Sequence, residues 1–194
     1  MNHMLPRVCI CLVLMAAQFS ATPAGALQIS QEEFSDSFKD GDLEMVLMGA
    51  TLKRFQISKA VAVGLYMEEG VEEEQILTAV PKRVEMAILQ NLSREELIKE
   101  AVKGMRDNLS PEAFTQIEPD IDRFSGWMRN VEPGDRYAFT YLPDRGTQVD
   151  LNGVKQGVIE SVDFALGYFS IYIGAKPTDP RAKRKLLGRL EFYQ

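Results

Sequence analysis

Cysteine and histidine are almost absent from this 194-residue chain. The two cysteines, Cys9 and Cys11, and the single histidine, His3, all lie within the first eleven residues. Beyond them the chain cannot form a thiol nucleophile, a disulfide, a Ser-His-Asp triad or a Cys/His zinc site. Carboxylates, lysine, arginine, tyrosine and hydroxyl groups are the reactive side chains that remain.

The first 26 residues have the features of an export signal. Arg7 precedes an apolar run of 13 residues, 8–20, which is too short to span a bilayer. The segment ends in Ala24-Gly25-Ala26, a small-x-small pattern that predicts cleavage between Ala26 and Leu27. We expect a mature protein of residues 27–194 in the periplasm or secreted, where the lack of cysteine suits an oxidising environment.

A surplus of positive charge is also missing. Without Arg7, the mature chain has 21 basic residues against 28 acidic ones. This balance argues against a general binder of nucleic acid or of an anionic membrane. One local exception is the basic run Arg181–Lys185. It could contact an acidic partner or phospholipid head groups, or it could be an ordinary solvated helix end.

The pattern of apolar residues predicts a single α+β domain over residues 27–194. After a polar lead-in, 27–42, we expect an antiparallel sheet with helices packed on one face. Ser93 and Glu96 form a capping-box pattern at one helix start, and Pro119 is expected to interrupt another helix. The expected strands are 43–55, 59–69, 82–92, 135–143, 146–153 and 155–159, and the expected helices are 70–80, 94–109, 110–128, 158–174 and 179–188.

Four segments of the chain resemble, in order and spacing, the bacterial chalcone isomerase-like proteins. They are "GATLKRFQISKAVAVGLYMEE", "PKRVEMAILQNLSREELIKEAVKGM", "GDRYAFTYLPDRGTQVDLNGVKQGVI" and "FALGYFSIYIGAKPTDPRAKRKLLG". The resemblance runs from Leu43 to Gly188. It implies an open-faced β-sandwich, an antiparallel sheet covered on one side by helices, with a ligand cleft between the two layers. The family includes plant enzymes that close chalcones to flavanones and plastid fatty-acid-binding proteins.

The resemblance implies no isomerase activity, because the residues that hold substrate in the plant enzymes are not preserved. Those positions correspond here to Lys53, Val61, Leu97, Gly104 and Ile171. Four of them cannot hydrogen-bond a phenolate through a side chain, and the lysine retains only the charge. We therefore expect a protein without catalytic residues, cofactor or metal, and rank an intramolecular lyase last among its functions.

The resemblance to fatty-acid-binding relatives leaves a ligand-binding function open. Lys53 or Arg54 is the candidate anchor for the acidic head of an apolar or fatty-acid-like ligand, although both also suit a solvated strand end. The small residues Ala60, Ala62 and Gly64 share one strand face, which could be a groove floor or a surface for a closely packed helix. The rival hypothesis is an interaction protein that uses the same scaffold without a ligand.

Three further features have simple structural interpretations. Glu160 and Asp163, three residues apart, suit a polar helix stripe better than an acid–base or metal site. Asn152-Gly153 is typical of a tight turn. Trp127, the only tryptophan, is expected to pack in the core or in a lid.

Overall fold

The structure is a computed structural model that describes residues 26–54 and 60–188. The expected export signal, except for its last residue Ala26, lies outside the described residues, and so does the segment between the first two long strands. In the part that is described, no helix is both long and apolar enough to cross a membrane.

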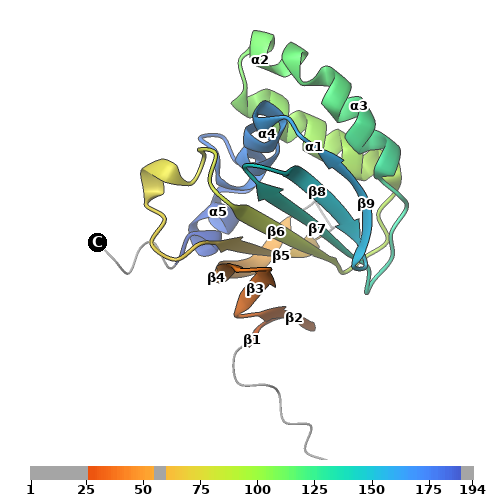
Figure 1. Ribbon diagram of the computed structural model, residues 1–194. Helices are drawn as coiled ribbons and strands as arrows, with labels where there is room; N and C mark the ends of the chain where they lie inside the picture. Colours follow the sequence, from red (N-terminus) through yellow and green to blue (C-terminus); the bar gives the residue numbers. More distant parts are fainter. Residues whose placement is uncertain (1–25, 55–59, 189–194) are drawn as a thin grey trace, which may run out of the picture.

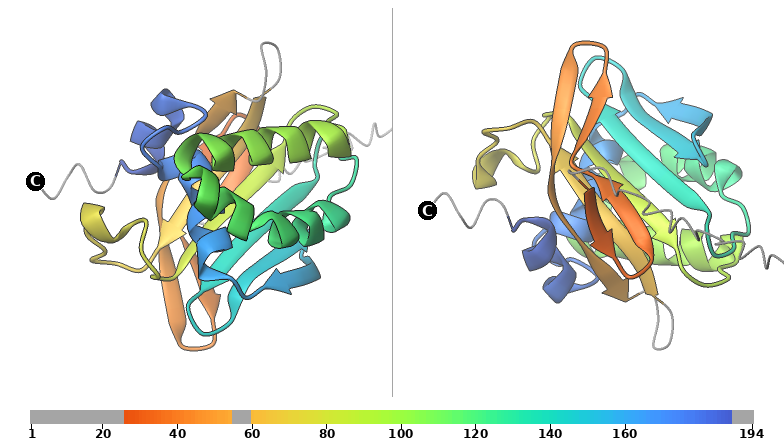
Figure 2. Two further views of the ribbon diagram at one scale, coloured as in Figure 1. Left: turned by 90° about the horizontal axis from the view of Figure 1, so that it is seen from above. Right: turned by 90° about the horizontal axis from the view of Figure 1, so that it is seen from below.

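The centre of the fold is a seven-stranded antiparallel sheet whose strand order, β3-β4-β5-β6-β7-β8-β9, follows the chain (Figure 1). Helices α1 to α4 cover one face of this sheet, as the view from above shows (Figure 2). The α+β, open-faced architecture is therefore confirmed. The strands are β3 (Ser37–Asp40), β4 (Leu43–Arg54), β5 (Ala60–Met67), β6 (Lys82–Ile88), β7 (Arg136–Leu142), β8 (Gly146–Leu151) and β9 (Val154–Ile159).

The helices begin where the sequence places their caps. At the start of α1 (Arg94–Asn108), the Ser93 hydroxyl accepts from the Glu96 backbone N–H at 3.2 Å, and the Glu96 carboxylate accepts from the Ser93 N–H at 2.8 Å. The expected interruption of the next helix is also present, between α2 (Pro111–Gln116) and α3 (Glu118–Trp127). Pro119 lies in the first turn of α3, where its missing N–H costs no hydrogen bond.

Two expected helices differ from the structure. Residues 70–80 contain only a short 3₁₀ turn, Glu73–Gln75, because this acidic segment has too few apolar residues to bury a helix face. The late helix, α4, spans Val162–Ile173 and not the expected 158–174. Val158 and Ile159 instead complete β9, and Ser161 caps α4 by accepting from the Phe164 N–H.

The expectation of a polar lead-in over 27–42 was wrong, because this segment is built of strands. β1 (Ala26–Ile29) and β2 (Glu32–Ser35) form a hairpin, and β3 pairs with β4. The hairpin lies on the sheet face that the helices leave open (Figure 2). Phe34 of β2, fully buried, is at the centre of a second and smaller apolar core on that face. Few apolar residues were visible in this segment because one side of each short strand faces solvent.

A last helix, α5 (Pro180–Leu186), packs across β4 at a position where a side chain has no room. Asp179 caps this helix by accepting from the N–H groups of Arg181 and Ala182. A Cβ atom on Gly49 would lie 2.1 Å from the carbonyl oxygen of Lys185. β4 also has an irregularity beside this contact, because its pairing with β5 shifts register between Leu47 and Gly49.

Candidate functional site

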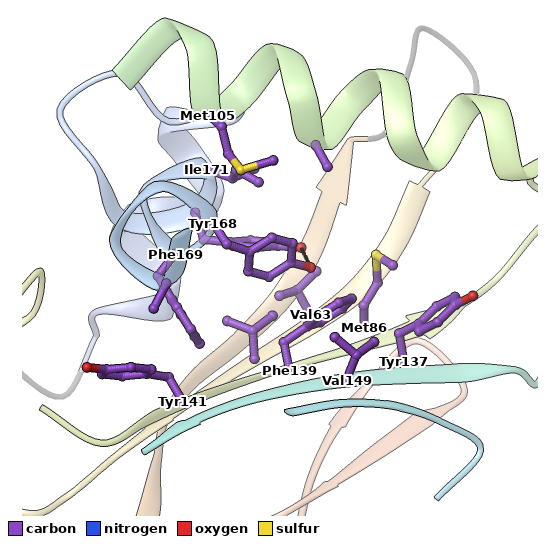
Figure 3. Close-up of a cluster of buried hydrophobic side chains, with 14 of the residues drawn as sticks. Val63, Met86, Met105, Tyr137, Phe139, Tyr141, Val149, Tyr168, Phe169 and Ile171 are labelled. Carbon is purple, nitrogen blue, oxygen red and sulfur yellow. Dashed lines mark hydrogen bonds between the residues drawn. The ribbon is translucent and has the colours of Figure 1, made fainter. Parts of the chain in front are cut away.

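The space between the sheet and the helices is filled by an apolar layer rich in aromatic rings. Figure 3 shows Tyr168 of α4 above Phe139 of the sheet, and Ile171 of α4 beside Met105 of α1. The rings of Phe139 and Tyr168 are 4.4 Å apart between centroids, and Phe124 of α3 lies beside both. Polar groups that enter this layer are therefore conspicuous.

Lys53 enters this layer and Arg54 does not. Adjacent residues of a strand point to opposite faces, so only one of the pair can face the helices. The Lys53 side chain is 3% exposed, whereas Arg54 is exposed and its backbone N–H donates to Asp179 at 3.2 Å. The two alternative anchors are thereby separated: Lys53 lies at the sheet–helix interface, and the Arg54 side chain lies at the surface.

The Lys53 ammonium group meets a carboxylate and an aromatic ring inside the interface. Its Nζ donates to Glu100 Oε1 of α1 at 3.3 Å and lies 5.9 Å from the centre of the Tyr172 ring. Burial lowers the pKa of Lys53, while the charges of Glu100 and Asp179 act in the opposite direction. Glu100 is 25% exposed, so this ion pair stands between the apolar layer and solvent.

A small cavity adjoins the ion pair. Its volume is about 30 Å³, enough for about one water molecule. Ligand pockets in proteins usually have volumes of roughly 300–1,000 Å³. The cleft is therefore almost completely filled by side chains. The cavity is lined by Lys53, Met86, Leu97, Glu100, Ala101, Phe124, Met128, Phe139, Tyr168, Ile171 and Tyr172.

Two tyrosine hydroxyl groups supply further polarity at this cavity. Tyr168 and Tyr172, one helical turn apart on α4, have their hydroxyl oxygens 3.3 Å apart. Burial raises the pKa of Tyr172 to about 12 and that of Tyr168 well above its ordinary value, so both hydroxyls stay protonated and able to donate. Sequence reasoning missed both tyrosines and Glu100, although the i, i+4 spacing of the tyrosines in an apolar helix was a visible signal.

Comparison with known proteins gives the family. A model of the chalcone isomerase-like family matches residues 26–188. The chain belongs to this family. A fatty-acid-binding protein of Arabidopsis thaliana has a similar structure, with a TM-score of 0.62 at 15% sequence identity, covering 82% of this chain and 93% of that one. The similarity of the two structures establishes a common fold. No curated protein matches the sequence.

Within this chalcone isomerase-like fold, the five positions that the sequence analysis aligned with substrate-holding residues of the plant enzymes are all buried. Lys53, Leu97 and Ile171 line the same cavity. Val61 is fully buried and pairs with Lys53 across the β4–β5 ladder, and a Cβ on Gly104 would lie 2.9 Å from Ile171. Four of these five positions therefore offer only apolar surface.

The face of small residues on β5 is not the floor of this cleft. Val61, Val63 and Leu65 face the helices, whereas Ala62 belongs to the second core on the opposite side. Gly64 also points there, since a Cβ on it would lie 2.6 Å from the ring of Phe34. Neither a groove nor a helix occupies this small face. The hairpin that the sequence analysis missed packs on it.

The remaining candidates behave as ordinary structural elements. Glu160 and Asp163 are exposed, and the described residues contain no group of three acidic, histidine or cysteine side chains arranged to hold a metal. Asn152 forms the expected turn with a positive φ of 53°. Trp127 is half-buried and packs on the edge strand, where a Cβ on Gly157 would lie 2.2 Å from its ring.

The basic run Arg181–Lys185 lies on α5. Lys183 donates to the carbonyl of Gly174 at 3.0 Å, while Arg181, Arg184 and Lys185 are exposed. Most of its charge is therefore at the surface and outside the cleft.

Proposed function

We propose that this chain is an exported, non-catalytic binding protein for an apolar carboxylic acid, with Lys53 as the anchor of the acid. The observation that carries the proposal is a buried ammonium group at the edge of an apolar, aromatic layer, beside two protonated tyrosine hydroxyls. A carboxylate needs charge-assisted hydrogen bonds when it leaves water, and these groups can supply them. The apolar run at residues 8–20 supports export to the periplasm.

The residues of the same cleft also favour a protein without catalytic activity. Enzymes accelerate a reaction through groups that bind the transition state more strongly than the substrate. At the positions of Val61, Leu97, Gly104 and Ile171, this cleft has no side chain that donates or accepts a proton. Its protonated tyrosines can orient an acid, and the arrangement suits binding better than chemistry.

Ligand entry requires the filled cleft to open. Two of the residues that line the cavity, Met86 and Met128, are flexible side chains that can repack at low cost. The acyl chain of the ligand would take the space that these side chains leave when they change rotamer. Ile98 and Val102 of α1 are only partly buried and lie at the border of the same core.

The anchor is tested by exchanging the two neighbouring basic residues separately. Lys53→Met keeps the volume of the side chain but removes the charge, so the affinity for dodecanoate should fall at least tenfold. The matched variant Arg54→Met removes an exposed charge and should change the affinity less than twofold. Displacement of a fluorescent fatty acid gives both values. Equal effects of the two variants would contradict the role of Lys53.

The filled cleft favours a second candidate, an interaction protein that carries no ligand. Its exposed basic residues on α5 would then contact an acidic partner. Native mass spectrometry of the protein purified from its periplasm distinguishes the two functions. A bound acyl mass that is lost in Lys53→Met supports the first function. A bare mass, together with no displacement of the fluorescent fatty acid, supports the second.

A further inference from the structure

The position of Glu100 on α1 is unusual for the partner of a buried lysine. The Lys53 side chain is 3% exposed and the Glu100 side chain 25%, so the carboxylate reaches inward from the solvent side of the pair. It contributes to the wall of the 30 Å³ cavity together with Leu97 and Ala101 of the same helix. Glu100 therefore occupies the contact that the carboxylate of a bound acid would make.

We propose that Glu100 is a displaceable internal carboxylate that closes the cleft and makes it selective for acids over neutral ligands. This inference rests on the proposed function. The carboxylate of an entering acid replaces Glu100 as the partner of the Lys53 ammonium, and the Glu100 side chain rotates outward to the solvent. Each buried charge keeps an opposite charge throughout the exchange, which avoids the large cost of an unpaired buried ion.

The selectivity follows from the same exchange. An alcohol with the same alkyl chain carries no charge, so it cannot replace Glu100 beside the buried ammonium. Displacement of Glu100 by an alcohol would exchange a charged partner of the buried Lys53 ammonium for a neutral group, which is costly. A neutral ligand must therefore leave the ion pair intact and fit into the small space that remains.

The surroundings of the pair suit an outward movement of Glu100. Lys103, three residues further along α1, is exposed and donates to Asp107 at 2.6 Å. The pKa of Lys103 is raised chiefly by Asp107 and also by the charge of Glu100. Lys103 can receive the displaced carboxylate in an i, i+3 ion pair. Asp179, Tyr168 and Tyr172 are titratable groups among the described residues near the pair, and the charge of Asp179 raises the pKa of Lys53.

The inference is tested by removing the charge of Glu100 while retaining the shape of its side chain. Glu100→Gln should bind dodecanoate about tenfold more tightly than the original protein at pH 6.5. Its affinity for dodecanol should stay within twofold. Glu95→Gln is the matched control, because it removes an equal charge from an exposed site on the same helix, and it should leave both affinities unchanged.

The outcomes separate this inference from the proposed function. If Lys53→Met loses dodecanoate and Glu100→Gln binds it as the original protein does or more weakly, the anchor stands and the role of Glu100 is wrong. A gain that is equal for dodecanoate and dodecanol would also overturn the inference, since it would reflect a looser cleft. If neither the original protein nor Glu100→Gln binds dodecanoate, the proposed function itself fails.

Discussion

Lys82 is a second buried lysine, and its neighbours differ in charge from those of Lys53. Its side chain is fully buried at the start of β6, where Nζ donates to the carbonyls of Thr78 at 2.5 Å and Val80 at 2.9 Å. Nζ also lies 5.1 Å from the centre of the Tyr141 ring. Within the described residues no carboxylate pairs with it, and burial lowers the pKa of Lys82 to about 8.

This shift predicts a pH dependence of stability. The unfolded chain holds the Lys82 proton up to a pKa of about 10.4, so between pH 8 and pH 10 it binds more protons than the folded protein. The free energy of unfolding should therefore rise across this range, by about 2 kcal/mol relative to Lys82→Met. Urea unfolding of both proteins from pH 7 to pH 10 measures the difference. If the difference in the free energy of unfolding between the two proteins does not change with pH, the pKa of Lys82 is not lowered in the folded protein.

The sequence predicted the candidate anchors at the residue scale but not their partners. The pair Lys53 and Arg54 stood out because basic residues are uncommon in a strand with apolar neighbours. Which of the two faces the helices depends on backbone geometry that composition does not reveal. Glu100 could not be distinguished from the other acidic residues of its helix, because an amphipathic pattern shows polar positions and not the contacts they make across layers.

At the scale of the element, α5 depends on the absence of a side chain at Gly49. A Cβ there would meet the carbonyl oxygen of Lys185 at 2.1 Å, a backbone atom that cannot turn aside. Gly49→Val should lower the free energy of unfolding by about 3 kcal/mol through overpacking. Gly126→Ala is the control, since nothing lies within 4 Å of its Cβ and alanine favours a helix.

Hydrogen exchange locates the effect of Gly49→Val. The amides of α5 should exchange faster in this variant, because the helix loses its close packing on β4. Gly126→Ala should leave them unchanged. Equal protection of α5 in Gly49→Val and the original protein would contradict the close contact.

Element positions were predictable where local chemistry decides them. The capping box at Ser93 and the proline in the first turn of α3 depend on neighbours in the sequence, and both were found. The hairpin β1–β2 was missed because its stability comes from Phe34 packing against Gly64, thirty residues away. Short strands of four residues carry too little alternation to be recognised without that tertiary contact.

At the scale of the whole molecule, the sheet separates two apolar cores. The larger core lies under the helices and includes the cavity, and the smaller one lies under the hairpin. Phe34→Ala should lower the free energy of unfolding by about 3–5 kcal/mol because it empties the smaller core. Its affinity for dodecanoate should stay within twofold, since the sheet stands between Phe34 and Lys53.

Urea unfolding and displacement of the fluorescent fatty acid test these two expectations on one variant. A loss of affinity comparable to that of Lys53→Met would show that the two cores are coupled through the sheet. Retained stability would show that the hairpin is not anchored by its phenylalanine.

The irregular pairing in β4 decides which chemical group the cleft presents. Before it, Val46 and Met48 pack on the helix side. After it, Thr51 and Lys53 are the buried residues on that side, whereas Ala50 belongs to the second core. The inward residues thus change from even to odd numbers at one extra residue, which is what a β-bulge does. With regular pairing throughout, Arg54 would face the helices. A single inserted residue, five positions away, therefore selects an amine over a guanidinium for the cleft.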